Sequence, residues 1–180
     1  MTKFVKGVER PPGRTVEMEM NSTPLSFVRM FGPDGPTSIA ANQWTPIVLD
    51  PAGEVWLQFG EKCWEPILPG DPDYFEFPAG VRCLKEGVYG FAGGVIFDSA
   101  NQTGDRAVDV TEAKGPYANR WNLVASQPMP KVSDAGLIVS GEAYQYVGNI
   151  VELRASSTVA TVTITNPQSE WLSAVLLHAA

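Results

Sequence analysis

The chain has 180 residues, with 13 basic and 20 acidic side chains and a formal net charge of −7. Hydrophobic residues make up 44% of it and charged residues 18%. This balance excludes a disordered chain, which combines low hydrophobicity with high net charge. No apolar run reaches the ~20 residues that a membrane-spanning helix needs, so we expect no membrane partner. The 17 glycines and 15 prolines show no period, which indicates many turns within one domain.

Charge is distributed unevenly along the chain. Residues 1–35 carry five basic and four acidic side chains, whereas residues 36–180 carry eight basic and sixteen acidic ones. The acidic body argues against nucleic acid as a partner, because phosphates bind to basic surfaces. The basic start of the chain suits docking on an acidic protein surface or on nucleic acid, or a solvated tail. The first 20 residues lack an apolar signal region, so we expect a protein made and kept in a cytoplasm.

Segments with β-type composition recur every 10–15 residues with turn signals between them, and no window shows convincing helical periodicity. The turn-rich stretch 32–36 predicts a boundary between an N-terminal arm and a domain. These features predict an all-β chain, folded as an antiparallel sandwich or barrel of about ten strands. The expected strands are 38–39, 45–49, 54–59, 63–67, 74–77, 87–98, 106–112, 120–125, 136–147, 149–155, 158–165 and 171–178.

Two of these segments indicate how the sheets are covered. In 87–98, alternation gives one bulky face, expected to be core, and one face of small apolar residues. In 171–178, both faces are largely apolar. A two-layer sandwich covers only one face of each sheet, so something else must cover the other face of this strand. Another subunit and residues 1–35 are the two candidates.

Residues typical of catalytic sites are sparse. The one histidine, His178, lies three residues from the end, where a structural role is expected. Cys63 and Cys83 form no C-x-x-C motif, and a bridge between them is neither implied nor excluded. Neither a phosphate-binding loop nor a dinucleotide-binding glycine motif is present. We therefore expect no enzyme and no cofactor.

Two groups of acidic residues have the oxygen ligands that calcium prefers. Asp71 and Asp73 with Glu76 form one group, and Asp98, Asn101 and Asp105 form the other. Neither group follows a known calcium-loop pattern, and acidic turns are common. We therefore expect no metal site.

Five tryptophans offer candidates for sugar stacking or interface anchoring. Trp171 and Trp56 are expected in or near the core. Trp64 and Trp121 are the candidates for exposed positions.

Three motifs occur in a familiar order. Gly87-Val-Tyr-Gly-Phe91 resembles the G-x-Y-x-F strand of the complement C-one-q and tumour-necrosis-factor-like jelly roll. Val147-Gly-Asn-Ile-Val-Glu-Leu153 resembles its x-G-D-x-V-x-L strand, with Asn149 in place of aspartate. Glu170-Trp-Leu-Ser-Ala-Val-Leu-Leu177 resembles its final strand. The resemblance covers roughly residues 36–180.

The resemblance implies a ten-strand jelly roll that assembles as a tight homotrimer and buries part of one sheet around a threefold axis. The chain departs from animal relatives in having neither a secretion signal nor a collagen stalk, and in an additional stretch at about 53–73. Domains of this kind without signals or stalks resemble those in virion proteins of tailed bacteriophages. The trimer-interface residues that the resemblance suggests are Tyr89, Phe91, Leu153, Trp171 and Leu172.

The function we expect is that of a bacteriophage virion protein, a trimeric capsid decoration or head-fibre protein. Residues 1–35 would attach it to the major capsid protein, and residues 36–180 would form a projecting knob on the capsid surface. The alternative is a tail-fibre or baseplate tip that binds a receptor or a host cell-surface glycan. The expected capsid-docking residues of the arm are Lys3, Phe4, Val5, Lys6, Arg10, Arg14 and Phe27.

Overall fold

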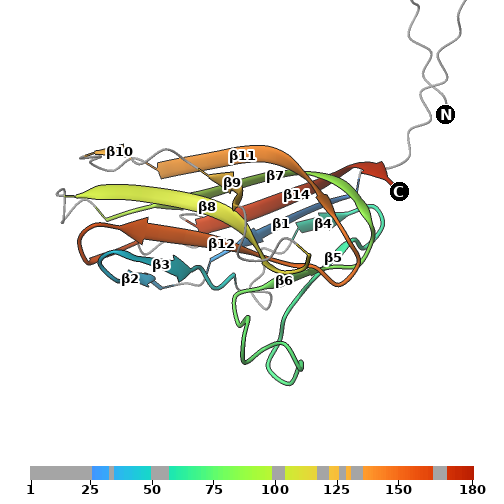
Figure 1. The fold of residues 1–180 in the computed structure, drawn as a ribbon, viewed down its shortest axis with the longest axis horizontal. Helices are drawn as coiled ribbons and strands as arrows, with labels where there is room; N and C mark the ends of the chain where they lie inside the picture. Colours follow the sequence, from blue (N-terminus) through green and yellow to red (C-terminus); the bar gives the residue numbers. More distant parts are fainter. Residues whose placement is uncertain are drawn as a thin grey trace, which may run out of the picture.

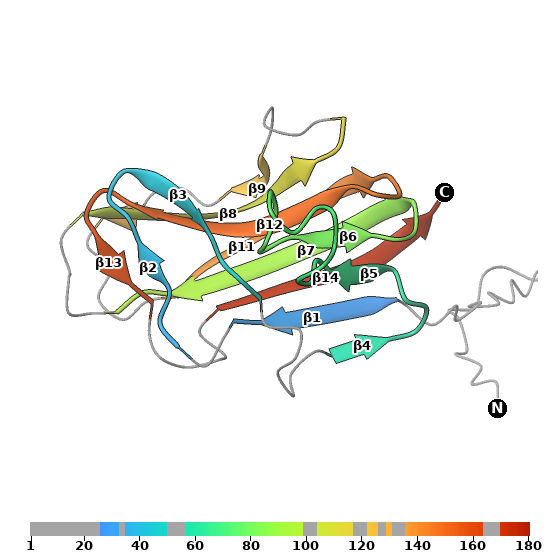
Figure 2. The ribbon, with the colours of Figure 1, turned by 90° about the horizontal axis from the view of Figure 1, so that it is seen from below.

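The computed structural model describes residues 26–32, 35–49, 57–98, 104–116, 122–125, 129–130, 136–163 and 170–180. Within these residues the chain is all-β, and its longest strands run along the long axis of the molecule in two layers (Figures 1 and 2). The described residues contain no helix of the length and apolar character needed to cross a membrane.

The first layer is a five-stranded antiparallel sheet. Its centre is the pair formed by β7 and β14, whose sequences carry two of the three recognised motifs. In spatial order the sheet consists of β11 (Gly136–Gln145), β7 (Gly87–Ile96), β14 (Glu170–Ala179), β1 (Phe27–Phe31) and β4 (Leu57–Phe59).

The second layer is built around β8 and β12, which pair over eight residues. The segment around β3 (Gln43–Pro46) runs beside β12, where the amides of Asn42 and Ile47 donate to the carbonyls of Ser157 and Leu153. β2 (Ser38–Ile39) and β13 (Thr161–Val162) form a separate two-stranded sheet. The order of the second layer is β10 (Met129–Pro130), β8 (Asp105–Lys114), β12 (Ile150–Ser157), β6 (Val81–Cys83) and β5 (Trp64–Pro66), with β9 (Asn122–Ala125) also paired to β8.

Apolar side chains from both layers meet between the sheets. Tyr89 and Phe91 of β7 are buried, as the bulky face of that strand predicted. The Trp64 ring lies edge-on to both, with centroids 4.9 Å from Tyr89 and 5.7 Å from Phe91. Leu153 of β12 enters the core from the opposite layer, so close to β7 that a Cβ atom on Gly93 would lie 2.8 Å from its Cδ1.

Several boundaries differ from those expected. β1 pairs with β14 and β4 inside the first sheet, so residues 27–31 belong to the sandwich rather than to an arm that ends at residue 35. Residues 74–77 form turns instead of a strand, because the amides of Tyr74 and Phe77 bond back to the carbonyls of Asp71 and Asp73. The expected strand 158–165 is reduced to β13 among its described residues.

Candidate assembly surface and its braced loop

The outer face of the first sheet is built from the alternate residues that do not enter the core. Three cross-strand rows define it, and we call it the outer face. Its polar side chains are few, with Arg29 and Glu142 the charged ones within the three rows. The rows are Phe31–Trp171–Gly94–Ile138, Arg29–Ser173–Ala92–Ser140 and Phe27–Val175–Gly90–Glu142.

Small residues of β7 make a groove along the middle of this face. Gly90 and Ala92 form its floor, with Val175 and Leu177 on one side and Ser140 and Glu142 on the other. Because glycine and alanine leave room above the sheet, a protruding side chain or edge from a partner can approach the backbone closely. The groove therefore gives the outer face a shape into which a partner protein can pack.

Trp171 is laid flat along the sheet instead of projecting from it. A Cβ atom on its cross-strand neighbour Gly94 would lie only 2.6 Å from the indole Nε1, so glycine is what admits the ring. The guanidinium of Arg29 lies 4.5 Å from the Trp171 ring centroid and 5.2 Å from that of Phe31. This stacking presents a broad, largely apolar surface around one partly covered cation.

Exposed aromatic rings continue the surface at one end of β11. Tyr144 is 38% exposed, and its ring forms an edge-to-face pair with that of Tyr146, with the two ring centroids 5.0 Å apart. The Tyr144 hydroxyl donates to Glu86 at 2.5 Å, which raises the pKa of the tyrosine to about 12. This hydrogen bond orients the phenol ring at the surface.

The expected trimer-interface residues lie on the wrong side of the sheets. Tyr89, Phe91, Leu153 and Leu172 are each 2% exposed or less, and all four pack between the two layers. The alternation in 87–98 predicts that Tyr89 and Phe91 face the core, and the structure agrees with the alternation rather than with the interface residues that the resemblance suggests. Of the five, Trp171 alone lies on the outer face.

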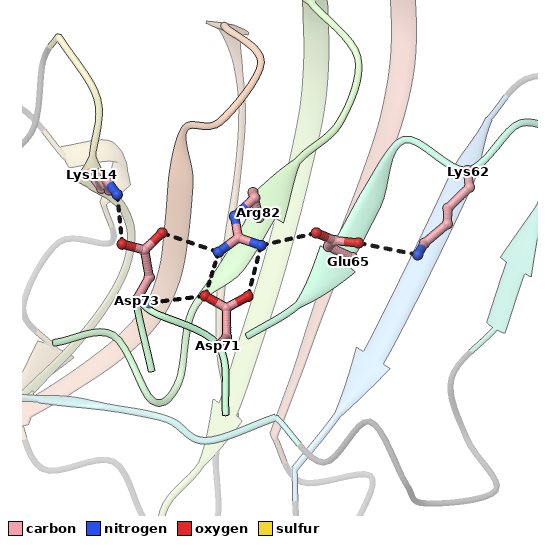
Figure 3. Close-up of polar contacts among 6 residues, drawn as sticks. All are labelled: Lys62, Glu65, Asp71, Asp73, Arg82 and Lys114. Carbon is pink, nitrogen blue, oxygen red and sulfur yellow. Dashed lines mark hydrogen bonds and ion pairs between the residues drawn. The ribbon is translucent and has the colours of Figure 1, made fainter. Parts of the chain in front are cut away.

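A loop between β5 and β6, residues 67–80, projects from the sandwich (Figure 1). Figure 3 shows the ion pairs that brace it: Arg82 of β6 binds Asp71 at 2.6 and 2.9 Å, Asp73 at 3.0 Å and Glu65 at 3.0 Å. Lys114 of β8 binds the other oxygen of Asp73 at 2.6 Å. These bonds hold the pKa values of both aspartates below their ordinary range, chiefly through Arg82 for Asp71 and Lys114 for Asp73.

These ion pairs explain the role of the first of the two acidic groups that were considered as calcium ligands. The carboxylates of Asp71 and Asp73 are committed to Arg82 and Lys114, and Glu76 is exposed. Among the residues that the structure describes, no three His, Cys, Asp or Glu side chains gather as metal ligands. Of the second group, Asn101 lies outside the described residues.

Phe75, near the tip of the braced loop, is fully exposed.

Both cysteines are buried free thiols. The Cys63 thiol donates to the Ser26 hydroxyl at 3.0 Å, and the Cys83 thiol donates to the Lys85 carbonyl at 3.0 Å. Burial raises the pKa of Cys83 to about 11, so it remains an unreactive thiol at neutral pH.

The architecture agrees with solved structures. Crystal structures of murine APRIL match with a TM-score of 0.57 at 19% identity (pH 5.0) and 0.52 at 18% identity (pH 8.5), covering 85% of this chain and 99% of theirs. The PRD1 vertex protein P5 matches with a TM-score of 0.54 at 16% identity, covering 85% of this chain and 97% of its own. The chain has a tumour-necrosis-factor-like jelly-roll fold.

At these identities the similarity shows the fold alone, and it confirms the all-β jelly roll that the sequence predicted. No known family model matches the sequence, and no curated protein matches it.

The expected surface residues divide between the described and undescribed parts of the chain. The arm residues from Lys3 to Arg14 lie outside the described residues, as do Trp56 and Trp121. Phe27 is a strand residue of β1. Trp64 was expected at the surface but is 2% exposed, since it faces β7 across the core. Trp44, which the sequence did not distinguish, is 40% exposed.

Proposed function

We propose that this chain is a homotrimeric structural protein of a bacteriophage virion, which binds and stabilises the capsid shell. The observation that carries the proposal is the outer face of the β11-β7-β14-β1 sheet. It is largely apolar, it is grooved along β7, and the described part of the chain does not cover it. A second and third copy of the same jelly roll are the occupants that the resemblance to the tumour-necrosis-factor-like family implies.

Packing of this face against neighbouring copies supplies the assembly energy. Val175 and Leu177 are partly exposed in the single chain, and Ile138 is 67% exposed. Burying such side chains is worth about 25 cal/mol per Å² of apolar surface removed from water. A closed threefold ring lets one patch on each copy meet a different patch on the next, so that no apolar edge is left open.

The virion assignment draws on the fold of PRD1 vertex protein P5 and on the charge division of the sequence. Residues 1–25 carry four basic side chains, Lys3, Lys6, Arg10 and Arg14, and three acidic ones, whereas residues 26–180 carry nine basic and seventeen acidic ones. The arm docks on acidic residues of the major capsid protein, and the acidic jelly roll projects outward. A trimer that binds the assembled shell more tightly than it binds free capsid subunits stabilises the shell by mass action.

The test compares the full chain with a chain that begins at Ser26, which keeps β1 in the sheet. Each is mixed with undecorated capsids of the parent phage and sedimented. The full chain is expected to co-sediment and to raise the temperature at which the capsids release their DNA, and the shortened chain is expected to stay in the supernatant. Equal co-sedimentation of both chains, or of neither, contradicts the attachment role of residues 1–25.

A further inference from the structure

A cleft lies beside β3 on the second layer and is built around Trp44. The outer face belongs to the first layer, so the two surfaces are separate. The cleft is lined by residues from three segments that are distant in sequence and meet where β3 runs beside β12 (Figure 1). We call it the Trp44 cleft. Its lining includes Asn42, Gln43, Trp44, Asp105, Ser156 and Thr158.

The Trp44 ring is held in place before any ligand arrives. The guanidinium of Arg154 lies 5.3 Å from the ring centroid. That guanidinium is fixed in turn by two bonds to the fully buried Asp109, from Nε to Oδ1 at 3.0 Å and from Nη2 to Oδ2 at 2.8 Å. A stacking surface held in this way loses little conformational entropy on binding.

The backbone around the cleft is fixed as well. The Asn42 amide donates to the Ser157 carbonyl at 2.7 Å, and Asn42 has a φ of 57°, a left-handed conformation that asparagine tolerates. Across the cleft, the Asp105 amide donates to the Thr158 hydroxyl at 2.8 Å, and the Thr158 amide donates to the Asp105 carbonyl at 2.9 Å. The cleft therefore has a defined shape in the free protein.

The polar groups around the ring are mostly neutral. Asn42 and Gln43 are exposed lining residues with amide side chains, Ser156 and Thr158 are lining residues with hydroxyls, and Asp105 is an exposed lining residue with a carboxylate. Arg106 also lines the cleft, but it is 1% exposed and its guanidinium lies over the Phe97 ring at 5.1 Å. With no exposed cation in its lining, the cleft offers an anionic ligand nothing to pair with. Arg154 already occupies part of the tryptophan's π surface, which disfavours a cationic ligand.

We propose that the Trp44 cleft binds a neutral saccharide, with one pyranose ring stacked on Trp44 and its hydroxyls bonded to the amides of Asn42 and Gln43 and the carboxylate of Asp105. An aromatic face matches the apolar C–H face of a sugar ring. Amide groups donate and accept at once, and a carboxylate accepts two bonds, which suits neighbouring hydroxyls. The site lies on the second layer, so it stands whether or not the chain assembles through the outer face.

The experiment uses the full chain and four neutral probes: maltotetraose, cellotetraose, tetra-N-acetylchitotetraose and galactotetraose. Binding is measured by saturation-transfer NMR and by titration of tryptophan fluorescence. At least one probe is expected to bind, with the strongest transfer to the protons of one ring. The Trp44→Ala variant is expected to bind it about tenfold more weakly, and Trp44→Phe is expected to retain part of the affinity.

Two further variants keep the test decisive. Gln43→Ala changes an exposed side chain, so it leaves the fold intact and is expected to weaken binding about threefold through loss of a hydrogen bond. Phe75→Ala removes a fully exposed aromatic ring on the β5–β6 loop and is expected to leave binding unchanged. Failure of all four probes to bind overturns the proposal. So does equal binding by Trp44→Ala, an equal loss in Phe75→Ala, or a preference for a lysine-rich peptide over every saccharide.

Discussion

Replacing Glu152 by glutamine is expected to stabilise the protein, and to do so only above mildly acidic pH. Glu152 lies on β12, is 6% exposed and is paired across the strands with Thr111. The positive charge nearest to it along β12 is Arg154, which is already bonded bidentately to Asp109. Burial raises the pKa of Glu152 to about 7, with Arg154 lowering it and Asp109 raising it by smaller amounts.

The size and pH range of the effect follow from that pKa. The difference between an ordinary glutamate pKa of 4.5 and a folded value of about 7 corresponds to about 3 kcal/mol. Between these two pH values the folded state binds more protons than the unfolded state, so this group's contribution to stability falls as pH rises. Glutamine keeps the shape of the side chain without the charge. We expect Glu152→Gln to be about 1–3 kcal/mol more stable than the parent at pH 8 and nearly equal to it at pH 4.5.

Urea unfolding at both pH values, at one fixed protein concentration, measures this difference. Glu76→Gln is the matched control, because Glu76 is an exposed glutamate on the β5–β6 loop, away from the outer face, and its change is expected to have no effect at either pH. A Glu152→Gln variant that is less stable than the parent at pH 8, or one whose advantage is the same at both pH values, refutes the reasoning.

Three other substitutions test separate parts of the account. Val175→Asp places a carboxylate in the groove of each copy, at a desolvation cost of several kcal/mol per charge, so light scattering should show a folded monomer; a trimer that persists argues against this face. Leu153→Ala opens a cavity in a fully buried site and should lower the free energy of unfolding by about 2–5 kcal/mol, and a loss below 1 kcal/mol would contradict the packing. Arg82→Met leaves Asp71 and Asp73 without their shared cation. The lowered pKa values of both aspartates stabilise the fold when the pH is above the pKa of an aspartate in the unfolded chain, and this stabilisation is lost as the pH falls through the folded pKa values. The melting temperature of Arg82→Met should therefore be lower than that of the parent at pH 7 but not near pH 2. An equal drop at both pH values would contradict the bracing.

Local pattern predicted the strands but not the surroundings of their side chains. The alternation in 87–98 and 171–178 identified β7 and β14 and their two faces correctly. It also predicted that the bulky face of 87–98, with Tyr89 and Phe91, is core, and the interface residues that the resemblance suggested conflicted with that prediction. Local pattern does not show which strand lies opposite a given side chain. The same limit applies to Trp64 and Trp44, whose exposures depend on which strand lies opposite.

The braced loop shows what local sequence does not contain. Asp71 and Asp73 read as an acidic turn, and their partners Arg82 and Lys114 lie on two other strands of the second layer. The prolines and glycines around residues 27–31 favour an arm in the sequence, yet these five residues form β1 and add a strand to the first sheet through pairing with β14. A short strand has a weak sequence signal, and the partner residues that stabilise it lie at least 140 positions away.

The most direct test of the central claim is the mass of the full chain in solution, measured by light scattering coupled to size exclusion. Assembly through the outer face predicts roughly 58 kDa, three times the 19.5 kDa of the chain, at every concentration from about 1 µM upward. A mass of 19.5 kDa throughout that range would contradict it, because no neighbouring copy would then cover the apolar face of the β11-β7-β14-β1 sheet.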